Sequence, residues 1–232
     1  MRKIFIGCSI MLACVVTALS AAAQGATRSV SGYNGVECNG PFNVEVKIDG
    51  TETLRLDVDA DILNDIESKV EGGVLKVQMK HHWRNHSNVK RANIYITAKQ
   101  LNYLGNGGSG NMVLEGTVTG SNAKLALSGS GNLRAAVKSG AVQLHLSGSG
   151  GIITKGSAGD AEVHISGSGN VDARGLTTQK VDASISGSGG VEIVANQTVS
   201  ASISGSGGVE FSGNASIGET HYSGSGRVNK RN

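Results

Sequence analysis

The chain has few of the residues that usually build binding pockets and cross-linked cores. Among its 232 residues, aromatic side chains make up 3%, proline occurs once and cysteine three times. So few rings exclude extended stacking on sugars or bases as the main mode of binding. Glycine, in contrast, occurs 35 times, and the core is therefore expected to consist of small aliphatic side chains.

The first 23 residues have the features of a secretory signal peptide. Arg2 and Lys3 precede an uncharged apolar stretch over residues 4–19, and three alanines form a cleavage site before Gln24. The stretch is too short for a permanent membrane helix, so no transmembrane segment is expected after cleavage. The sequence therefore predicts an exported protein, located in the periplasm, on the outer membrane surface or outside the cell.

Removing this leader leaves a nearly neutral chain with a single cysteine. The full chain has 21 Lys and Arg against 18 Asp and Glu, and the leader carries two of the basic residues. No basic tract remains that would support nucleic-acid binding. Neither a disulfide nor a cysteine metal site is predicted, and Cys38 is expected to be a buried small apolar residue. Lipidation at Cys14 is an alternative to cleavage, although the apolar run continues past that residue.

A short Gly/Ser corner occurs seven times from residue 107 onward. Successive corners start 21, 19, 19, 20, 18 and 19 residues apart. A fixed period is typical of a solenoid, in which each repeat forms one coil and buries its apolar face against neighbouring coils. A flexible Gly/Ser linker would not place apolar residues at the same offsets every time. The corners are Gly107–Gly110 and the SGSG sequences that begin at Ser128, Ser147, Ser166, Ser186, Ser204 and Ser223.

Apolar residues alternate on both sides of each corner. They occupy the first and third positions before it, and the fifth and seventh positions after its first residue. This alternation predicts two short strands in each coil, both facing one interior. Such strands are expected to pair in parallel with the coils above and below, about 4.8 Å away. The predicted fold is all-β, a parallel β-helix (β-solenoid) with coils of about 19 residues. The position directly before the corner is held by Leu127, Leu146, Ile165, Ile185, Ile203 and Tyr222.

The segment from residue 24 to 104 lacks regular corners but keeps strand signals. Apolar residues alternate over residues 42–48 and 54–58. Residues 69–77 are expected to form a strand, a Gly-Gly turn and a second strand. Residues 59–66 are expected to form one helical turn capped by an aspartate.

The order of these segments resembles a known family of exported proteins. The chain contains GYNGVECNGPFNVEVKIDGTETLRLDVD, then VEGGVLKVQM, then NIYITAKQLNYLGNGGSGN, and then recurrent LSGSGN and ISGSGG corners. Over about residues 28–228 it resembles the autotransporter-adhesin head GIN family, which is common in Bacteroidetes-type bacteria. The resemblance implies a right-handed parallel β-helix at the cell envelope and a role in adhesion. It also implies a single head GIN domain over residues 24–232, with a degenerate part at 24–104 and regular coils at 105–232.

Two columns of outward-facing side chains are candidates for a surface-binding site. His145 and His164 occupy the second position before the corner in consecutive coils, which places them about 5 Å apart. Neutral imidazoles at that distance could share a transition metal, but two solvated surface histidines would give the same pattern. Asp172, Glu192 and Glu210 occupy the sixth position after the first corner residue in consecutive coils. Stacked carboxylates repel one another unless solvent or a weakly bound calcium ion relieves the charge.

The segment over residues 80–92 is polar, basic and aperiodic and is expected to be an exposed loop. Metal binding is also an alternative for three histidines of this segment. No carboxylate or thiol is placed beside them to complete a site. The sequence therefore predicts no catalytic, cofactor or metal site. The three histidines are His81, His82 and His86.

Three function classes fit a leader followed by a repetitive rod. The favoured class is an adhesin or surface-interaction module of the cell envelope, without catalytic activity, that binds a polysaccharide or protein ligand. The second is a structural element that assembles into homo-oligomers, because the ends of a solenoid are sheet edges ready to pair. The third is a carbohydrate-active β-helix enzyme, which needs clustered carboxylates with basic partners. Only Asp172, Glu192 and Glu210 form such a cluster, and no basic residue is expected beside them.

Overall fold

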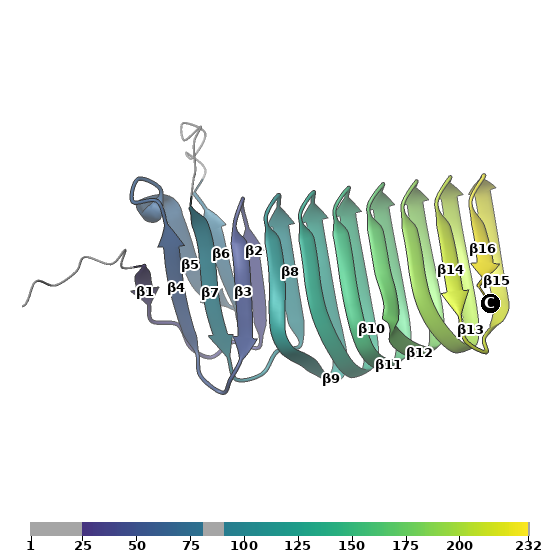
Figure 1. Cartoon of the computed structure of the whole chain (residues 1–232), viewed down its shortest axis with the longest axis horizontal. Coiled ribbons are helices and arrows are strands. Elements are labelled where there is room, and N and C mark those ends of the chain that lie inside the picture. The colour runs from purple at the N-terminus through teal and green to yellow at the C-terminus, as the bar shows by residue number, and fades with distance from the viewer. Residues whose placement is uncertain (1–24, 81–90, 232) are drawn as a thin grey trace, which may run out of the picture.

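A computed structural model describes residues 25–80 and 91–231. Over these residues the chain forms a rod of stacked coils, with β1 at one end and the C-terminal strands at the other (Figure 1). The sixteen strands of the described chain belong to one continuous sheet that wraps around the rod. The described residues contain no helix that is long and apolar enough to cross a membrane. The predicted leader lies outside the described residues.

The rod has an irregular N-terminal part and a repeating part. The N-terminal strands are β1 (Ala26–Arg28), β2 (Gly35–Asn39), β3 (Asn43–Ile48), β4 (Thr53–Val58), β5 (Ile66–Glu71), β6 (Val74–Met79), β7 (Ala92–Ala98) and β8 (Tyr103–Gly108). The repeating strands are β9 (Asn111–Gly129), β10 (Asn132–Gly148), β11 (Gly151–Gly167), β12 (Asn170–Gly187), β13 (Gly190–Gly205), β14 (Gly208–Ser212), β15 (Ser216–Gly224) and β16 (Arg227–Lys230).

The repeating strands pair in parallel, as predicted. Leu133 of β10 lies beside Ile152 of β11, which lies beside Val171 of β12. Val171 in turn lies beside Val191 of β13. These partners are 19, 19 and 20 residues apart in the chain, which confirms a solenoid with coils of the predicted length.

One prediction about the coils is wrong. Each coil from β9 to β13 contains one continuous strand of 16 to 19 residues that bends around the rod, where two short strands were expected. The pairing continues around the bend because neighbouring coils have nearly the same length, so that Val137 still pairs with Gly156 there. Where the lengths differ, the register shifts, as between Ala173 and Thr177 of β12.

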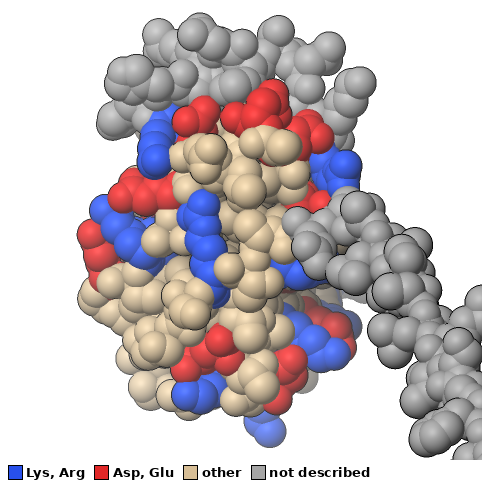
Figure 2. All heavy atoms as spheres, turned by 90° about the vertical axis from the view of Figure 1, so that its left-hand side faces the viewer, with Lys and Arg blue, Asp and Glu red and all other residues tan. Residues whose placement is uncertain are grey.

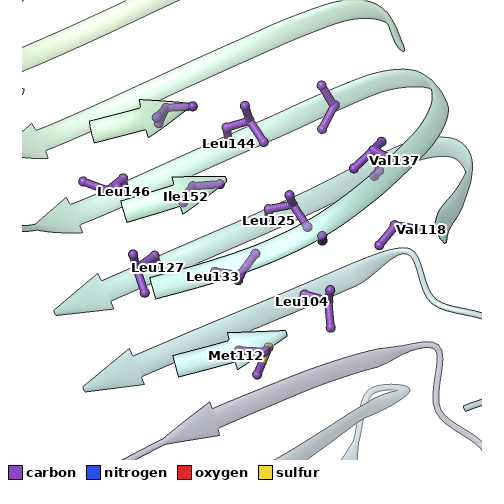
Figure 3. Close-up of a cluster of buried hydrophobic side chains, with 14 of the residues drawn as sticks. Leu104, Met112, Val118, Leu125, Leu127, Leu133, Val137, Leu144, Leu146 and Ile152 are labelled. Atoms are coloured by element: carbon purple, nitrogen blue, oxygen red, sulfur yellow. The ribbon is translucent and has the colours of Figure 1, made fainter. Parts of the chain in front are cut away.

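The predicted columns of aliphatic side chains fill the interior of the coils. Leu127, Leu146 and Ile165 come from consecutive coils, and each is 2% exposed. Leu125 and Leu144 are register partners in a second buried column (Figure 3). Full burial of one such side chain stabilises the fold by about 1.5–3 kcal/mol, so these columns supply the main stabilising contribution of each coil.

Tyr222 is an exception to the predicted core. It holds the position directly before the corner in β15, but it is 44% exposed. Within the described chain β15 pairs only with β13, so no second coil covers this side chain. The prediction that Tyr222 faces a closed interior is therefore wrong.

The N-terminal part mixes parallel and antiparallel pairing. Strand β3 is parallel to both β7 and β9, whereas β4 is antiparallel to β7 and β1 is antiparallel to β4. Strands β5 and β6 form the predicted antiparallel hairpin. Gly72 and Gly73 at its turn have φ values of +58° and +76°, as a type I′ turn requires. Strand β2 pairs in parallel with β6 and β8 and so connects the hairpin to the first regular coil.

Charged side chains of both signs are intermixed at the N-terminal end of the rod (Figure 2). On the hairpin, Lys69 and Lys76 lie 2.9 and 3.1 Å from the carboxylate of Glu71. Strand β5 pairs only with β6 among the described strands, so these charges stand at a sheet edge. Charged groups on an edge strand discourage pairing with another chain.

The other N-terminal predictions have mixed outcomes. The helical turn is a three-residue 3-10 helix, Leu63–Asp65, whose cap residue is Ile62 and makes no side-chain hydrogen bond, so the predicted aspartate cap is wrong. Most of the loop predicted at residues 80–92 lies outside the described residues, but Ala92 is buried at the start of β7. Cys38 is buried as predicted, and its burial raises the pKa of the thiol.

Candidate functional site

A groove of about 460 Å³ crosses the coils on the exterior of the strand segments that precede the corners. It extends from β2 and β8 to β12. Because alternate residues of a strand point to opposite faces, the residue directly before each corner enters the core and its two neighbours face outward. The outward residues that line the groove are Gly105, Ala126, His145, His164 and Ser184 in one column, and Gly107, Ser128, Ser147, Ser166 and Ser186 in the next.

The groove brings His145 and His164 together, as predicted. They are register partners on β10 and β11, and their ring centroids lie 4.9 Å apart with the ring planes tilted by 35°. Nε2 of His145 is buried and has no hydrogen-bond partner. Burial, followed by the charge of Lys124, lowers the pKa of His145. The imidazole of His145 is therefore neutral at neutral pH.

Glu162, which was not among the predicted site residues, lies beside His164 on β11. Its Oε1 is 2.8 Å from Nε2 of His164, and its Oε2 accepts a hydrogen bond of 2.8 Å from Nε2 of Gln143 on β10. The bond to His164 is the largest cause of a lowered pKa of Glu162. The ionised carboxylate can only accept, so Nε2 of His164 donates. Glu162 thus orients His164 and connects two coils.

Polar residues of β2 and β8 form the N-terminal end of the groove. Glu37 accepts hydrogen bonds from the Tyr103 hydroxyl, at 3.2 Å, and from Nδ2 of Asn39, at 2.9 Å. Burial and then the charge of Glu37 raise the pKa of Tyr103 to about 12, so its hydroxyl stays protonated at neutral pH. The groove therefore has an aromatic ring and a carboxylate at one end, imidazoles near its middle and serine hydroxyls along most of its length.

The acidic column is also formed, but it has basic partners. Asp172, Glu192 and Glu210 are register partners on β12, β13 and β14. Arg174 donates to both carboxylate oxygens of Asp172, at 2.9 and 2.6 Å, and its Nε lies 3.4 Å from Oε2 of Glu192. Arg231 lies 3.6 Å from the same oxygen of Glu192. The expectation of a column without basic neighbours is therefore wrong. The two arginines relieve the repulsion between the carboxylates.

Replacing Arg174 with glutamine is expected to raise the pKa of Asp172 toward the ordinary value of about 3.9. The hydrogen bond from the Arg174 side chain is the largest cause of the lowered pKa. A lowered folded-state pKa stabilises the protein above the pKa of the unfolded chain, and this stabilisation is lost as the pH falls through the folded value. At neutral pH the variant should therefore be less stable than the original protein by this contribution. Its stability should also fall less as the pH drops through the folded-state pKa of Asp172. Carboxyl-carbon NMR titration measures the pKa, and an unchanged value would contradict the ion pair.

The two predicted columns do not form one site. The histidines line the groove before the corners, whereas none of the three acidic residues does. Glu192 and Glu210 instead border a separate hollow of about 300 Å³, together with Arg174 and Arg231. The five predicted binding residues therefore lie on two surfaces of the rod.

Within residues 25–80 and 91–231, no group of three or more His, Cys, Asp and Glu side chains is arranged to hold a metal ion. The two-histidine cluster in the groove has Glu162 bonded to one imidazole rather than free. The loop histidines considered as an alternative lie outside the described residues, namely His81, His82 and His86.

Several known proteins share the fold of this rod. A family model described as "Putative auto-transporter adhesin, head GIN domain" matches residues 32–215. A putative adhesin from Bacteroides fragilis NCTC 9343 has a TM-score of 0.81 at 23% identity, over 89% of this chain and 95% of that chain. A putative adhesin from Parabacteroides merdae ATCC 43184 has a TM-score of 0.69 at 20% identity, over 91% and 98%. A putative lipid binding protein from Parabacteroides distasonis ATCC 8503 has a TM-score of 0.67 at 24% identity, over 91% and 98%. No curated protein shows a significant match.

Proposed function

The chain belongs to the head GIN domain family of putative auto-transporter adhesins, and from this membership we propose that it is an exported adhesion protein of the cell envelope. It binds its ligand through the exterior of the rod and catalyses no reaction. The observation that carries this proposal is the groove, which crosses several coils and therefore offers a repeated set of side chains to one ligand. The similar proteins from B. fragilis and P. merdae are described as putative adhesins as well.

The repetition of the groove suits an extended ligand. Successive coils follow one another at about 4.8 Å, and they present Ser128, Ser147 and Ser166 to the same groove. A rigid rod keeps these groups in line, so that several modest contacts act together and raise the affinity without a deep pocket. The ligand that fits this arrangement is an extended polymer, a polysaccharide or a polypeptide, that lies along the rod.

Substitutions along the groove are expected to weaken binding in steps. The test is a panel of envelope polysaccharides and glycopeptides, with affinities measured by surface plasmon resonance. For a ligand that binds, Ser147→Ala and Ser166→Ala should each reduce the affinity by about 3- to 10-fold, since each removes one hydrogen bond of about 0.5–1.5 kcal/mol. The matched control is Ser157→Ala, because Ser157 is exposed at the far bend of β11 and does not line the groove. A double groove variant that binds as well as the control would contradict the proposed surface.

One observation favours a second candidate function. Carboxylates and basic groups project together at the hollow formed by Glu192, Glu210, Arg174 and Arg231, and a carbohydrate-active enzyme would need such a cluster. The same panel distinguishes the two functions when the products are analysed by size. If the protein depolymerises a polysaccharide and Glu192→Gln abolishes that activity, the chain is an enzyme and the adhesin proposal fails.

A further inference from the structure

Among the described histidines, only His145 and His164 are register partners on neighbouring strands. Their parallel strands hold register partners about 4.8 Å apart, so the spacing of the two imidazoles depends on the backbone and not on a loop. The ring centroids lie 4.9 Å apart. Zinc binds imidazole nitrogen at about 2.0–2.1 Å, so one ion can bridge two rings whose nitrogens approach within roughly 4 Å. The side chain of His164 is 43% exposed, so an ion can reach it from solvent.

Each of the two rings has a nitrogen available for a metal. Because Nε2 of His164 donates to Glu162, the lone pair of its neutral ring is on Nδ1. Nε2 of His145 is buried and has no hydrogen-bond partner, so the ring must shift toward the groove to bind an ion but breaks no hydrogen bond of Nε2 in doing so. Metal-binding histidines usually donate their other N–H to a carboxylate, which fixes the tautomer and the ring orientation. Glu162 occupies that place, and Gln143 of the neighbouring coil holds Glu162.

We propose that His145 and His164 together bind one divalent transition-metal ion, of the kind represented by Zn²⁺, across the coils of β10 and β11. Glu162 is a positioning residue, because it acts on the ion through His164. Imidazole ligands suit zinc, copper and nickel, and water or a ligand in the groove takes the remaining coordination positions. The site goes beyond the proposed adhesion, since it requires no polymer ligand. Because the ion binds the folded coils, it should also stabilise them against unfolding.

The test is a titration with Zn²⁺ alone, followed by isothermal titration calorimetry and by thermal unfolding. It uses the full chain with His81, His82 and His86 replaced by alanine, so that these histidines cannot contribute. This parent protein should bind one Zn²⁺ per chain and unfold at a higher temperature when Zn²⁺ is present. His145→Ala and His164→Ala should each weaken binding at least tenfold and remove the thermal shift, and Glu162→Gln should weaken binding about 10- to 100-fold.

The matched control is His221→Ala in the same parent protein. His221 occupies the same column position on β15 and lies 3.1 Å from Glu219, but its register partner is Ser202. This variant should bind Zn²⁺ like the parent. Circular dichroism must show that each variant is folded, and His164→Gln serves as a second variant that keeps a polar group in the groove. No saturable Zn²⁺ binding by the parent, or binding that survives the loss of both His145 and His164, would overturn the proposal.

Discussion

Replacing Ile185 with aspartate is expected to unfold the regular coils or to lower their free energy of unfolding by more than about 4 kcal/mol. Ile185 is 1% exposed on β12 and lies between its register partners Ile165 and Ile203. A carboxylate at this position would be buried in an aliphatic column without a partner, and the lost side chain would leave a cavity. Because each coil buries its apolar face only against its neighbours, the damage should extend to β11 and β13.

The matched control is the same substitution at the adjacent residue, Ser184→Asp. Ser184 is exposed on the exterior of β12, so its carboxylate would stay in water and change the stability by less than about 0.5 kcal/mol. Urea unfolding followed by far-ultraviolet circular dichroism compares the two variants. Similar losses would mean that the two faces of the strand are exchanged, because a shift of one residue turns every side chain to the opposite face.

The regular coils could be predicted from sequence because one short pattern repeats with little variation. The corner spacing determines which residues stack on one another, and the alternation of apolar residues determines which of them face inward. The bends could not be predicted in this way. Val137 and Val142 are buried at the far side of the coil, but no Gly/Ser corner lies directly beside them in the sequence, so the continuity of each strand was missed.

The N-terminal part was less predictable because its strands are not equivalent to one another. The alternation over β3, β4 and β7 predicts strands, but not that β4 runs antiparallel to β7 while β3 runs parallel to it. The β5–β6 hairpin was predictable because Gly72 and Gly73 suit a turn that requires positive φ at both central residues. The contribution of Glu37 and Tyr103 to the groove depends on the parallel pairing of β2 with β8. No repeated sequence pattern predicts this pairing.

The candidate site was predicted where it follows the repeat. Consecutive coils place His145 beside His164, and the same register aligns the three carboxylates of the acidic column. Glu162 and Arg174 were detectable by the same rule, because each lies two residues from a predicted site residue on the same face of its strand. Arg231 was not detectable, because it follows β16 and its long side chain reaches Glu192 on β13.

Replacing Gly167 with alanine is expected to lower the free energy of unfolding by about 3 kcal/mol or more. Gly167 has a φ of +120°, a conformation that costs other residues about 1–3 kcal/mol. An added Cβ would also collide with the backbone carbonyl oxygen of Gly148 in the neighbouring coil. That oxygen accepts hydrogen bonds of 3.0 Å from the backbone N–H groups of Ser168 and Gly169, so it cannot move away without weakening the corner.

Two controls separate this collision from a general sensitivity of the corners, with urea midpoints as the measurement. Ser168→Ala changes an exposed residue of the same corner and keeps its backbone hydrogen bond, so its midpoint should stay close to that of the original protein. Gly151→Asn should also be tolerated, because Gly151 lies between Asn132 and Asn170 in register, and an added Cβ there approaches only a side-chain oxygen closely. If all three variants unfold at the same urea concentration, contact between successive corner backbones does not explain the repeat. If only Gly167→Ala loses stability, the result explains why glycine recurs at this position. The carbonyl group of each corner then occupies the space that a side chain would fill in the next corner.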